Sequence, residues 1–332
     1  MKNSEMPTVA QMVEQTGGWV EKPTAEVFGL SKEFSGKALQ TIKVPANSEV
    51  LPFLIERNEK IQLDADDVRR FLIAKFLRRP VMLTGPKGTG KTEAFEQFYA
   101  CMGLPCISVQ CGPGTDSDYL FGRPDLQDGS IGWVDGVASL ARRIGAGLLL
   151  DELDGLRSEF SPELNGFVVM HKPFTLMGQG FKHGTKVKDM VIPANEHFFL
   201  GATTNTGGKV EGGMDYVGRN PIDQTTLDRF YHMDKGYMEE EREVSVLRDT
   251  VAHLPEAMAK SMVQFANEMR HAHKREEVFE PVSLRSLVMW AEWTVVSGEL
   301  AEGFKMSVLS QMRDHDAAFA RNVYESYFRT LD

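Results

Sequence analysis

Eight consecutive residues with the pattern G-x-x-x-x-G-K-[ST] carry the clearest chemistry in this sequence: Gly85, Pro86, Lys87, Gly88, Thr89, Gly90, Lys91 and Thr92. The glycines allow backbone N–H groups to close around a phosphate at the N-terminus of a helix. Lys91 can reach the β- and γ-phosphate oxygens, and the hydroxyl of Thr92 can ligate Mg²⁺. The run therefore predicts a site for ATP and Mg²⁺.

The residues on both sides of this run predict the strand and the helix that flank a phosphate-binding loop. Residues 81–84 are an apolar segment typical of a short buried strand. Residues 91–101 are predicted to be a helix, because Gly103 and then Pro105 supply its stop signal. The predicted order is strand, loop and helix.

Two adjacent carboxylates follow a second apolar segment about 60 residues later. Residues 147–150 predict a buried strand, and Asp151 and Glu152 come directly after it, at the edge where open α/β sheets bind ligands. Asp151 is expected to hold Mg²⁺ together with Thr92, and Glu152 to polarise the water that attacks the γ-phosphate. The alternative is a strand that simply ends in solvated acids.

Three further polar residues are candidates for catalysis. Asn205 follows an apolar strand predicted over residues 197–203, where its amide can orient water without adding charge, although it could also be a simple turn residue. Arg229 stands just before another predicted strand and suits the nucleotide site of a neighbouring subunit, with a surface ion pair as the alternative. Arg285, near the start of a helix, is placed to reach the γ-phosphate of its own subunit.

The predicted elements form an α/β core followed by an all-helical region. The core contains a helix over residues 64–77 and parallel strands at residues 81–84, 106–110, 147–150, 197–203 and 229–233. Beyond residue 238 the periodicity is only helical, over residues 239–252, 255–273, 283–297 and 300–328. We therefore expect an N-terminal arm and linker (1–60), a nucleotide-binding domain (61–235) and a helical lid (236–332).

Composition and charge exclude several classes of protein. The 332 residues are 42% hydrophobic and 25% charged, values typical of a soluble globular protein. No apolar stretch approaches the ~20 residues that span a bilayer, so we expect a cytoplasmic protein without a membrane partner. The net charge of −10 makes nucleic acid an unlikely partner. The three cysteines, Cys101, Cys106 and Cys111, are expected to be reduced thiols.

With these features in this order, the chain resembles AAA+ P-loop ATPases of the MoxR-like branch. Residues 129–137 before the acidic strand resemble the hairpin insertion of that branch. The pattern is also similar to that of the ATPase subunits of aerobic cobaltochelatase (the CobS type), from about residue 26 to the C-terminus. The segments that carry this similarity are 28–30, 44–45, 88–91, 120–122, 128–129, 202–206, 227–229 and 290–292.

The resemblance implies a role for each candidate residue. Lys91 and Thr92 would be the Walker A residues, Asp151 and Glu152 the Walker B pair, Asn205 sensor 1, Arg229 the arginine finger and Arg285 sensor 2. It further implies a homo-oligomeric ring, usually a hexamer, and a partner protein with a von Willebrand factor A domain (CobT-like). The ring would remodel or activate a target complex by hydrolysing ATP.

Two glycine-rich inserts are candidates for contacting a partner. Residues 174–190 lie where MoxR-like proteins carry a hairpin near the ring pore, and residues 206–220 are as rich in glycine. Both are expected to move with the nucleotide state, with a plain flexible surface loop as the alternative. Two alternative functions remain open. One is a nucleotide-gated assembly scaffold in which turnover is incidental, and the other is a MoxR-type activator of an unrelated metalloenzyme rather than a cobaltochelatase subunit.

Overall fold

The computed structural model describes residues 6–31, 34, 36–127, 130–176, 191–206 and 221–328. These residues divide into two compact units. The first contains the described residues up to Gly85 and from Gly90 to Lys235, and the second contains Pro86–Thr89 and the described residues from Gly236 onwards.

A five-stranded parallel sheet forms the centre of the first unit, which confirms the predicted sheet. Its spatial order is β11-β3-β10-β7-β4. The bounds are β3 Val81–Thr84, β4 Cys106–Gln110, β7 Gly147–Asp151, β10 Phe199–Thr204 and β11 Tyr231–Asp234. Leu148, Leu149 and Phe199 are fully buried, which is why these strands appear in the sequence as continuous apolar runs.

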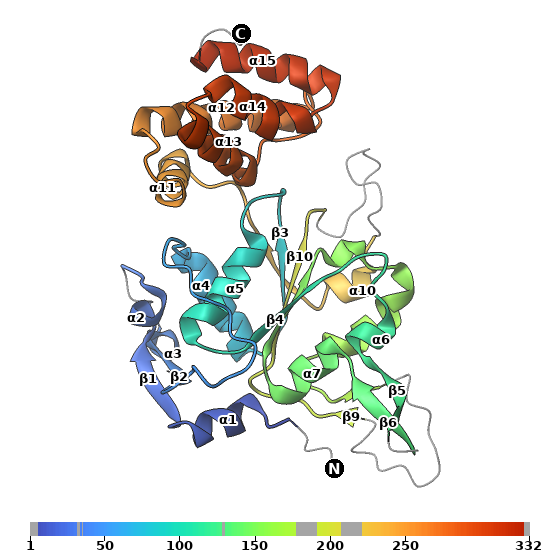
Figure 1. The fold of residues 1–332 in the computed structure, drawn as a ribbon. Helices are drawn as coiled ribbons and strands as arrows, with labels where there is room; N and C mark the ends of the chain where they lie inside the picture. Colours follow the sequence, from blue (N-terminus) through green and yellow to red (C-terminus); the bar gives the residue numbers. More distant parts are fainter. Residues whose placement is uncertain are drawn as a thin grey trace. The chain divides into compact units, whose positions relative to one another are not determined.

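Helices cover both faces of this sheet (Figure 1). On one face lie α4 (Ala65–Phe76) and α5 (Lys91–Met102), and on the other lie α7 (Val137–Ile144), α8 (Ser161–Phe167) and α10 (Gln224–Leu227). Phe95 on α5 packs on Phe71 of α4 and on Phe199 of the sheet, with ring centroids 5.8 and 5.6 Å apart. This aromatic cluster packs the helix that begins at Lys91 against α4 and against β10.

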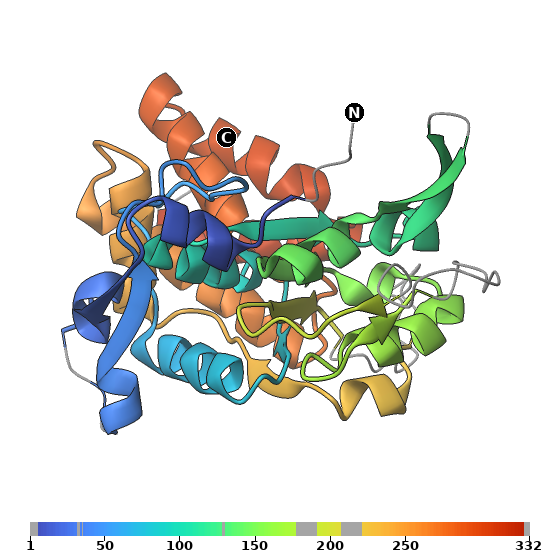
Figure 2. The same cartoon turned by 90° about the horizontal axis from the view of Figure 1, so that it is seen from below.

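Two smaller hairpins extend the first unit. One joins β5 (Gly122–Gln127) to β6 (Ser130–Asp135) after the short helix α6 (Ser117–Leu120), and it projects away from the sheet (Figure 2). The other pairs β8 (Phe174–Thr175) with β9 (Val191–Ile192). The expected mobile inserts at 174–190 and 206–220 fall almost entirely on residues 177–190 and 207–220, which lie outside the described residues.

The N-terminal segment, expected to be an arm, carries five short elements: α1 Val9–Gln15, β1 Trp19–Pro23, α2 Thr24–Phe28, α3 Lys37–Gln40 and β2 Thr41–Pro45. A capping box formed by Thr8 and Gln11 starts α1, and β1 pairs with β2. Phe28 stacks on Phe98 of α5, so the segment joins the core of the first unit. Elements of four to seven residues are too short to show a reliable periodicity in the sequence.

In its described residues from Gly236 onwards, the second unit contains only helices. These are α11 Glu240–Thr250, α12 Glu256–Lys274, α13 Leu284–Ser297, α14 Leu300–Ser307, η4 Leu309–Gln311 and α15 Asp314–Phe328. The single helix predicted over residues 300–328 is interrupted by η4. The second unit has its own hydrophobic core, in which the rings of Trp290, Phe265 and Phe304 pack together. No helix among the described residues combines the length and hydrophobicity needed to cross a bilayer.

A buried ion pair links two helices of this second unit. Arg270 on α12 donates to both carboxylate oxygens of Glu243 on α11, at 2.6 and 2.7 Å, and both residues are at most 3% exposed. Arg270 also donates to the carbonyl of Val282 and stacks on the ring of Tyr237. Each nitrogen of the guanidinium thereby has a hydrogen-bond acceptor, as a buried charge requires.

We predict that Arg270→Met lowers the stability of the protein by about 3–5 kcal/mol, because it leaves the Glu243 carboxylate buried without its counter-ion. Arg275→Met is the matched control, since Arg275 makes only exposed pairs with Glu277 and Glu268. Thermal and urea unfolding measure both variants. Equal unfolding midpoints for the two would contradict the importance of the buried pair.

Candidate nucleotide-binding site

The carboxyl ends of three adjacent strands bring the candidate residues to one edge of the sheet. Thr84, the last residue of β3, pairs with Thr204 of β10, and Gly85 and Asn205 follow them directly. Asp151 is the last residue of β7, on the other side of β10. Because parallel strands all point the same way, residues that follow their ends gather at one edge.

Lys91 connects the loop to the neighbouring strand. It is the first residue of α5 and is only 8% exposed. Its ammonium donates to the carbonyl of Gly85 and to Oδ1 of Asn205, both at 2.8 Å. Two residues predicted separately, from a loop motif and from a strand end, therefore lie in direct contact.

Thr92 makes the corresponding contact with the acidic strand. Its hydroxyl donates to Oδ1 of Asp151 at 2.7 Å, and Thr203 of β10 donates to the same oxygen at 2.6 Å. The carboxylate is thus oriented by one hydroxyl from the loop helix and one from the central strand.

The surroundings of Gly85 and the backbone conformation of Gly90 explain why the loop has glycine at these two positions. A Cβ on Gly85 would lie 2.0 Å from the carbonyl oxygen of Lys235, so a side chain at that position would have to move the backbone. Gly90 has φ = 75° at the start of α5 and offers no side chain to cap the helix. The first N–H groups of α5 therefore have no side-chain cap at Gly90, which is the arrangement that binds phosphate.

The donor set fits a magnesium–nucleotide complex. A hydroxyl and a carboxylate oxygen, from Thr92 and Asp151, converge at one point, and hard oxygen atoms are the ligands that Mg²⁺ prefers. No cluster of three or more His, Cys, Asp or Glu side chains suited to a metal occurs among the described residues. A Mg²⁺ ion here would need phosphate oxygens and water to complete its shell, which is its usual mode of binding.

Glu152 sits in an unusual backbone conformation directly after Asp151. Its φ and ψ are 55° and 51°, the left-handed region, which costs a non-glycine residue roughly 1–2 kcal/mol. Its N–H donates to the hydroxyl of Thr203 at 2.9 Å, which holds the turn, and η1 (Leu153–Gly155) starts there. Strain of this kind is found where the position of a side chain matters for function.

A second layer of hydrogen bonds, which the sequence analysis did not identify, supports the site. Asp154 is fully buried and accepts hydrogen bonds from the hydroxyls of Thr204 at 2.8 Å and Thr206 at 2.9 Å. Together with Thr203, these threonines join β10 to the turn after β7. The sequence feature that could have indicated these hydrogen bonds is the group of threonines flanking Asn205, since several threonines are unusual at the end of a buried strand.

Arg229 lies at the opposite edge of the sheet. It precedes β11, whose first residue, Tyr231, pairs with Val81 at the start of β3. β3 spans four residues, or about 13 Å at ~3.3 Å per residue, before the loop begins. Arg229 therefore stands far from its own P-loop. Instead, its Nε donates to Oδ1 of Asn165 on α8 at 3.3 Å.

Arg285, the fourth catalytic candidate, belongs to the second unit. It is the second residue of α13, and its side chain is exposed. Ser283 caps that helix by accepting a hydrogen bond from the N–H of Ser286. The structure thus brings Lys91, Thr92, Asp151 and Asn205 together, with Glu152 beside them, and it does not join Arg229 to this group.

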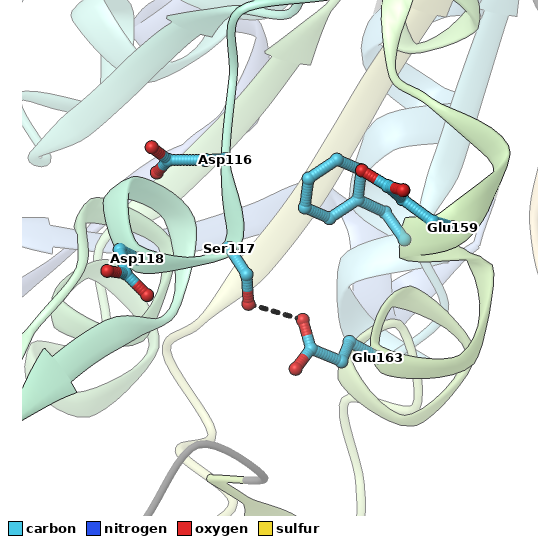
Figure 3. Close-up of a pocket in the computed structure, with 6 residues that line it drawn as sticks. Asp116, Ser117, Asp118, Glu159 and Glu163 are labelled. Atoms are coloured by element: carbon cyan, nitrogen blue, oxygen red, sulfur yellow. Dashed lines mark hydrogen bonds between the residues drawn. The ribbon is translucent and has the colours of Figure 1, made fainter.

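Two cavities of the first unit differ sharply in charge. The larger, about 470 Å³, is lined by Asp116, Ser117, Asp118, Glu159, Phe160 and Glu163, and Figure 3 shows Ser117 hydrogen-bonded to Glu163. Four carboxylates would repel a phosphate, so this cavity is not the nucleotide site. The smaller, about 150 Å³, contains five basic side chains in its lining: Arg78, Arg79, His171, Lys172 and Arg229.

Cys111 lies next to the acidic residues of the site but does not take part in it. It is 3% exposed, and burial, followed by the charges of Asp151, Asp154 and Glu152, raises the pKa of its thiol to about 12. Burial also raises the pKa values of Cys101 and Cys106. All three are free cysteines, so the predicted reduced state is what the structure shows.

Comparison with known proteins gives matches along most of the chain. Residues 80–230 match the AAA domain of the dynein-related subfamily, and residues 243–322 match the CbbQ/NirQ/NorQ C-terminal domain. The sheet order, the P-loop and the paired carboxylates agree with the first match. These matches assign residues 80–230 to the AAA domains and support the similarity of the chain to the MoxR-like branch of AAA+ ATPases.

Individual relatives of this AAA+ chain are distant but cover most of its length. It is 24% identical to the aerobic cobaltochelatase subunit CobS of Sinorhizobium sp., over 91% of this chain and 89% of that protein. It is 28% identical to the protein CbbQ of Hydrogenophilus thermoluteolus, over 71% of this chain and 82% of that protein. An uncharacterised protein of Bacillus subtilis, YojN, is 26% identical over 77% of this chain and 81% of its own length.

We predict that Cys106 and Cys111 do not react with a thiol reagent at pH 8 in the folded protein. The thiolate is the reactive form, and the raised pKa values keep both thiols protonated well above neutral pH. Counting reactive thiols before and after addition of denaturant measures this. Rapid modification of Cys111 in the native protein would show that this edge of the sheet is more open than the structure indicates.

Proposed function

We propose that this protein is an ATP-hydrolysing AAA+ ring ATPase that remodels or activates a partner complex. The observation that carries the proposal is the pair of hydrogen bonds from the start of α5 to the two neighbouring strand ends, Lys91 to Asn205 and Thr92 to Asp151. These four groups are the ones that phosphate binding, metal binding and positioning of water require.

In this proposal each residue of the edge has a distinct task. The P-loop from Gly85 to Thr92 binds the phosphates, with Lys91 along the β- and γ-oxygens. Thr92 and Asp151 would hold Mg²⁺, which would neutralise charge on the phosphates. Glu152 takes up the proton of the attacking water, and Asn205 orients that water.

The two arginines complete the proposed catalytic set. Arg229, at the far edge of the sheet from its own P-loop, serves the nucleotide of the neighbouring subunit, so that a ring, which we take to be a hexamer, is needed for hydrolysis. Arg285, exposed near the start of α13, senses the γ-phosphate bound to its own subunit.

The target of the ring is proposed from resemblance. The similarity to a cobaltochelatase subunit supports a separate partner protein with a von Willebrand factor A domain. The match of residues 243–322 to the CbbQ/NirQ/NorQ C-terminal domain favours a second candidate, an activator of another metalloenzyme. Both candidates use the same ATPase cycle and differ in the complex on which it acts.

We predict that Lys91→Ala abolishes ATP binding, because it removes the cation that lies along the phosphates. Glu152→Gln keeps Asp151 and the metal site, so it should bind ATP and turn it over at least ~100-fold more slowly than the wild type. Glu159→Gln, an exposed carboxylate of the acidic cavity, is the control and should leave turnover unchanged. Calorimetry and steady-state phosphate release measure the three variants. Undiminished ATP affinity in Lys91→Ala, or wild-type turnover in Glu152→Gln, would refute the assignment.

A mixing experiment tests the role of Arg229. Arg229→Ala and Lys91→Ala should each be inactive alone, with turnover reduced roughly 1,000-fold for the arginine. Mixed rings should regain activity, because an intact P-loop then meets an intact arginine at some interfaces. Rings proved to be mixed by mass but still inactive would assign Arg229 a structural role instead.

The partner proposal is tested by capture with and without nucleotide. Glu152→Gln, which should remain in the ATP state, is expected to retain a von Willebrand factor A protein from a lysate of the source organism in the presence of ATP and Mg²⁺. Lys91→Ala should not retain it. Mass spectrometry identifies the captured proteins. Absence of any such protein from the ATP sample would leave the metalloenzyme-activator candidate and exclude the chelatase-like one.

A further inference from the structure

The side chain that contacts Arg229 belongs to α8, a helix in the segment that follows β7. Asn165 is on α8, and its Oδ1 accepts a hydrogen bond from Nε of Arg229 at 3.3 Å. The segment that contains α8 begins at the turn after Asp151 and Glu152. The contact therefore joins the chain segment that follows the acidic pair to the arginine at the far edge.

The amide of Asn165 is tied down by two further hydrogen bonds. Oδ1 also accepts from the hydroxyl of Thr226 on α10 at 2.9 Å, and Nδ2 donates to Oδ2 of Asp223 at 3.4 Å. Asp223 and Thr226 belong to the short segment that ends at Arg229. Through three contacts, Asn165 fixes both the course of this segment and the guanidinium at its end.

A buried arginine anchors α8 itself. Arg142 on α7 is fully buried and donates to the carbonyls of Phe167, Val169 and Lys172, at the end of α8 and just beyond it. Carbonyls at a helix C-terminus lack partners within the helix, so a cation there stabilises the end. α8 thus provides a rigid support, as a group that must orient another side chain requires.

The contact at Nε leaves the other end of the guanidinium for a different ligand. Within the described part of the chain, Nε is the side-chain atom of Arg229 that forms a hydrogen bond, while its backbone N–H donates to the carbonyl of Thr226. Arg229 lines the small cavity together with Arg78, Arg79, His171 and Lys172. The four cationic side chains of this cavity, Arg78, Arg79, Lys172 and Arg229, with no acidic side chain among the lining residues, suit an anion, and the paired Nη groups of arginine are the atoms that bind phosphate oxygens.

We infer that Asn165 is a positioning residue for Arg229: by holding Nε, it orients the Nη groups towards the nucleotide phosphates of a neighbouring copy of the chain. This inference rests on the proposed function, since it assumes that Arg229 acts between subunits. Asn165 touches neither substrate nor metal in this scheme. Its effect on hydrolysis passes entirely through the guanidinium.

The test compares Asn165→Ala with Glu163→Gln, a control on the same helix whose side chain bonds to Ser117 rather than to Arg229. Asn165→Ala should lower kcat about 10- to 100-fold, the size of effect that misplacement of a catalytic group produces, and leave the affinity for ATP unchanged. The control should keep wild-type kcat. Asn165→Gln, which moves the amide by one methylene, should also lower kcat and covers the case in which the alanine variant does not fold.

Two readouts separate positioning from a general structural role. The double variant Asn165→Ala/Arg229→Ala should be no slower than Arg229→Ala alone, because both changes remove the same interaction. Asn165→Ala should also regain activity when mixed with Lys91→Ala, whose subunits supply an intact Asn165 and Arg229.

Failure of the inference is distinguishable from failure of the proposed function. Wild-type kcat in both Asn165 variants, or additive losses in the double variant, would overturn the positioning role while a slow Arg229→Ala upholds the proposed function. Wild-type turnover in Arg229→Ala would overturn both the positioning role of Asn165 and the proposed role of Arg229 between subunits.

Discussion

The site depends on one constraint: the carboxyl ends of β3, β10 and β7 lie side by side, so the residues that follow these strands must meet. Hydrogen bonds from Lys91 to Asn205 and from Thr92 to Asp151 close this edge around the start of α5. Thr203 strengthens the same junction, because it bonds to Asp151 and to the backbone of Glu152. Loss of the parallel pairing would separate all of these groups.

The sequence predicted those parts of the fold whose signals are local and long enough to detect. The P-loop pattern and the apolar strands located the site edge, because buried parallel strands appear as continuous hydrophobic runs. The short N-terminal elements were not predicted, since four to seven residues show no clear period and Phe28 finds its partner, Phe98, far along the chain. The break between α14 and α15 was missed because both helices share one apolar face with the same core.

Contacts of the site that depend on the third dimension could not be read from the sequence. Asp154 and Asn165 each form hydrogen bonds to residues about 50 to 60 positions away, Thr204 and Thr226. No motif marks either residue, since an aspartate in a turn and an asparagine on a short helix are common. The position of Arg229 before β11 was predicted, whereas its hydrogen bond to Asn165, 64 positions away, was not.

The central claim is that one copy of the chain supplies the phosphate-binding edge while the next supplies the arginine. The most direct measurement is ATP turnover per subunit as a function of protein concentration, with the oligomeric state followed by mass photometry in the same samples. Negligible turnover is expected where the chain is monomeric, with a rise in turnover that follows the appearance of rings. Equal turnover per subunit in monomers and in rings would contradict this claim.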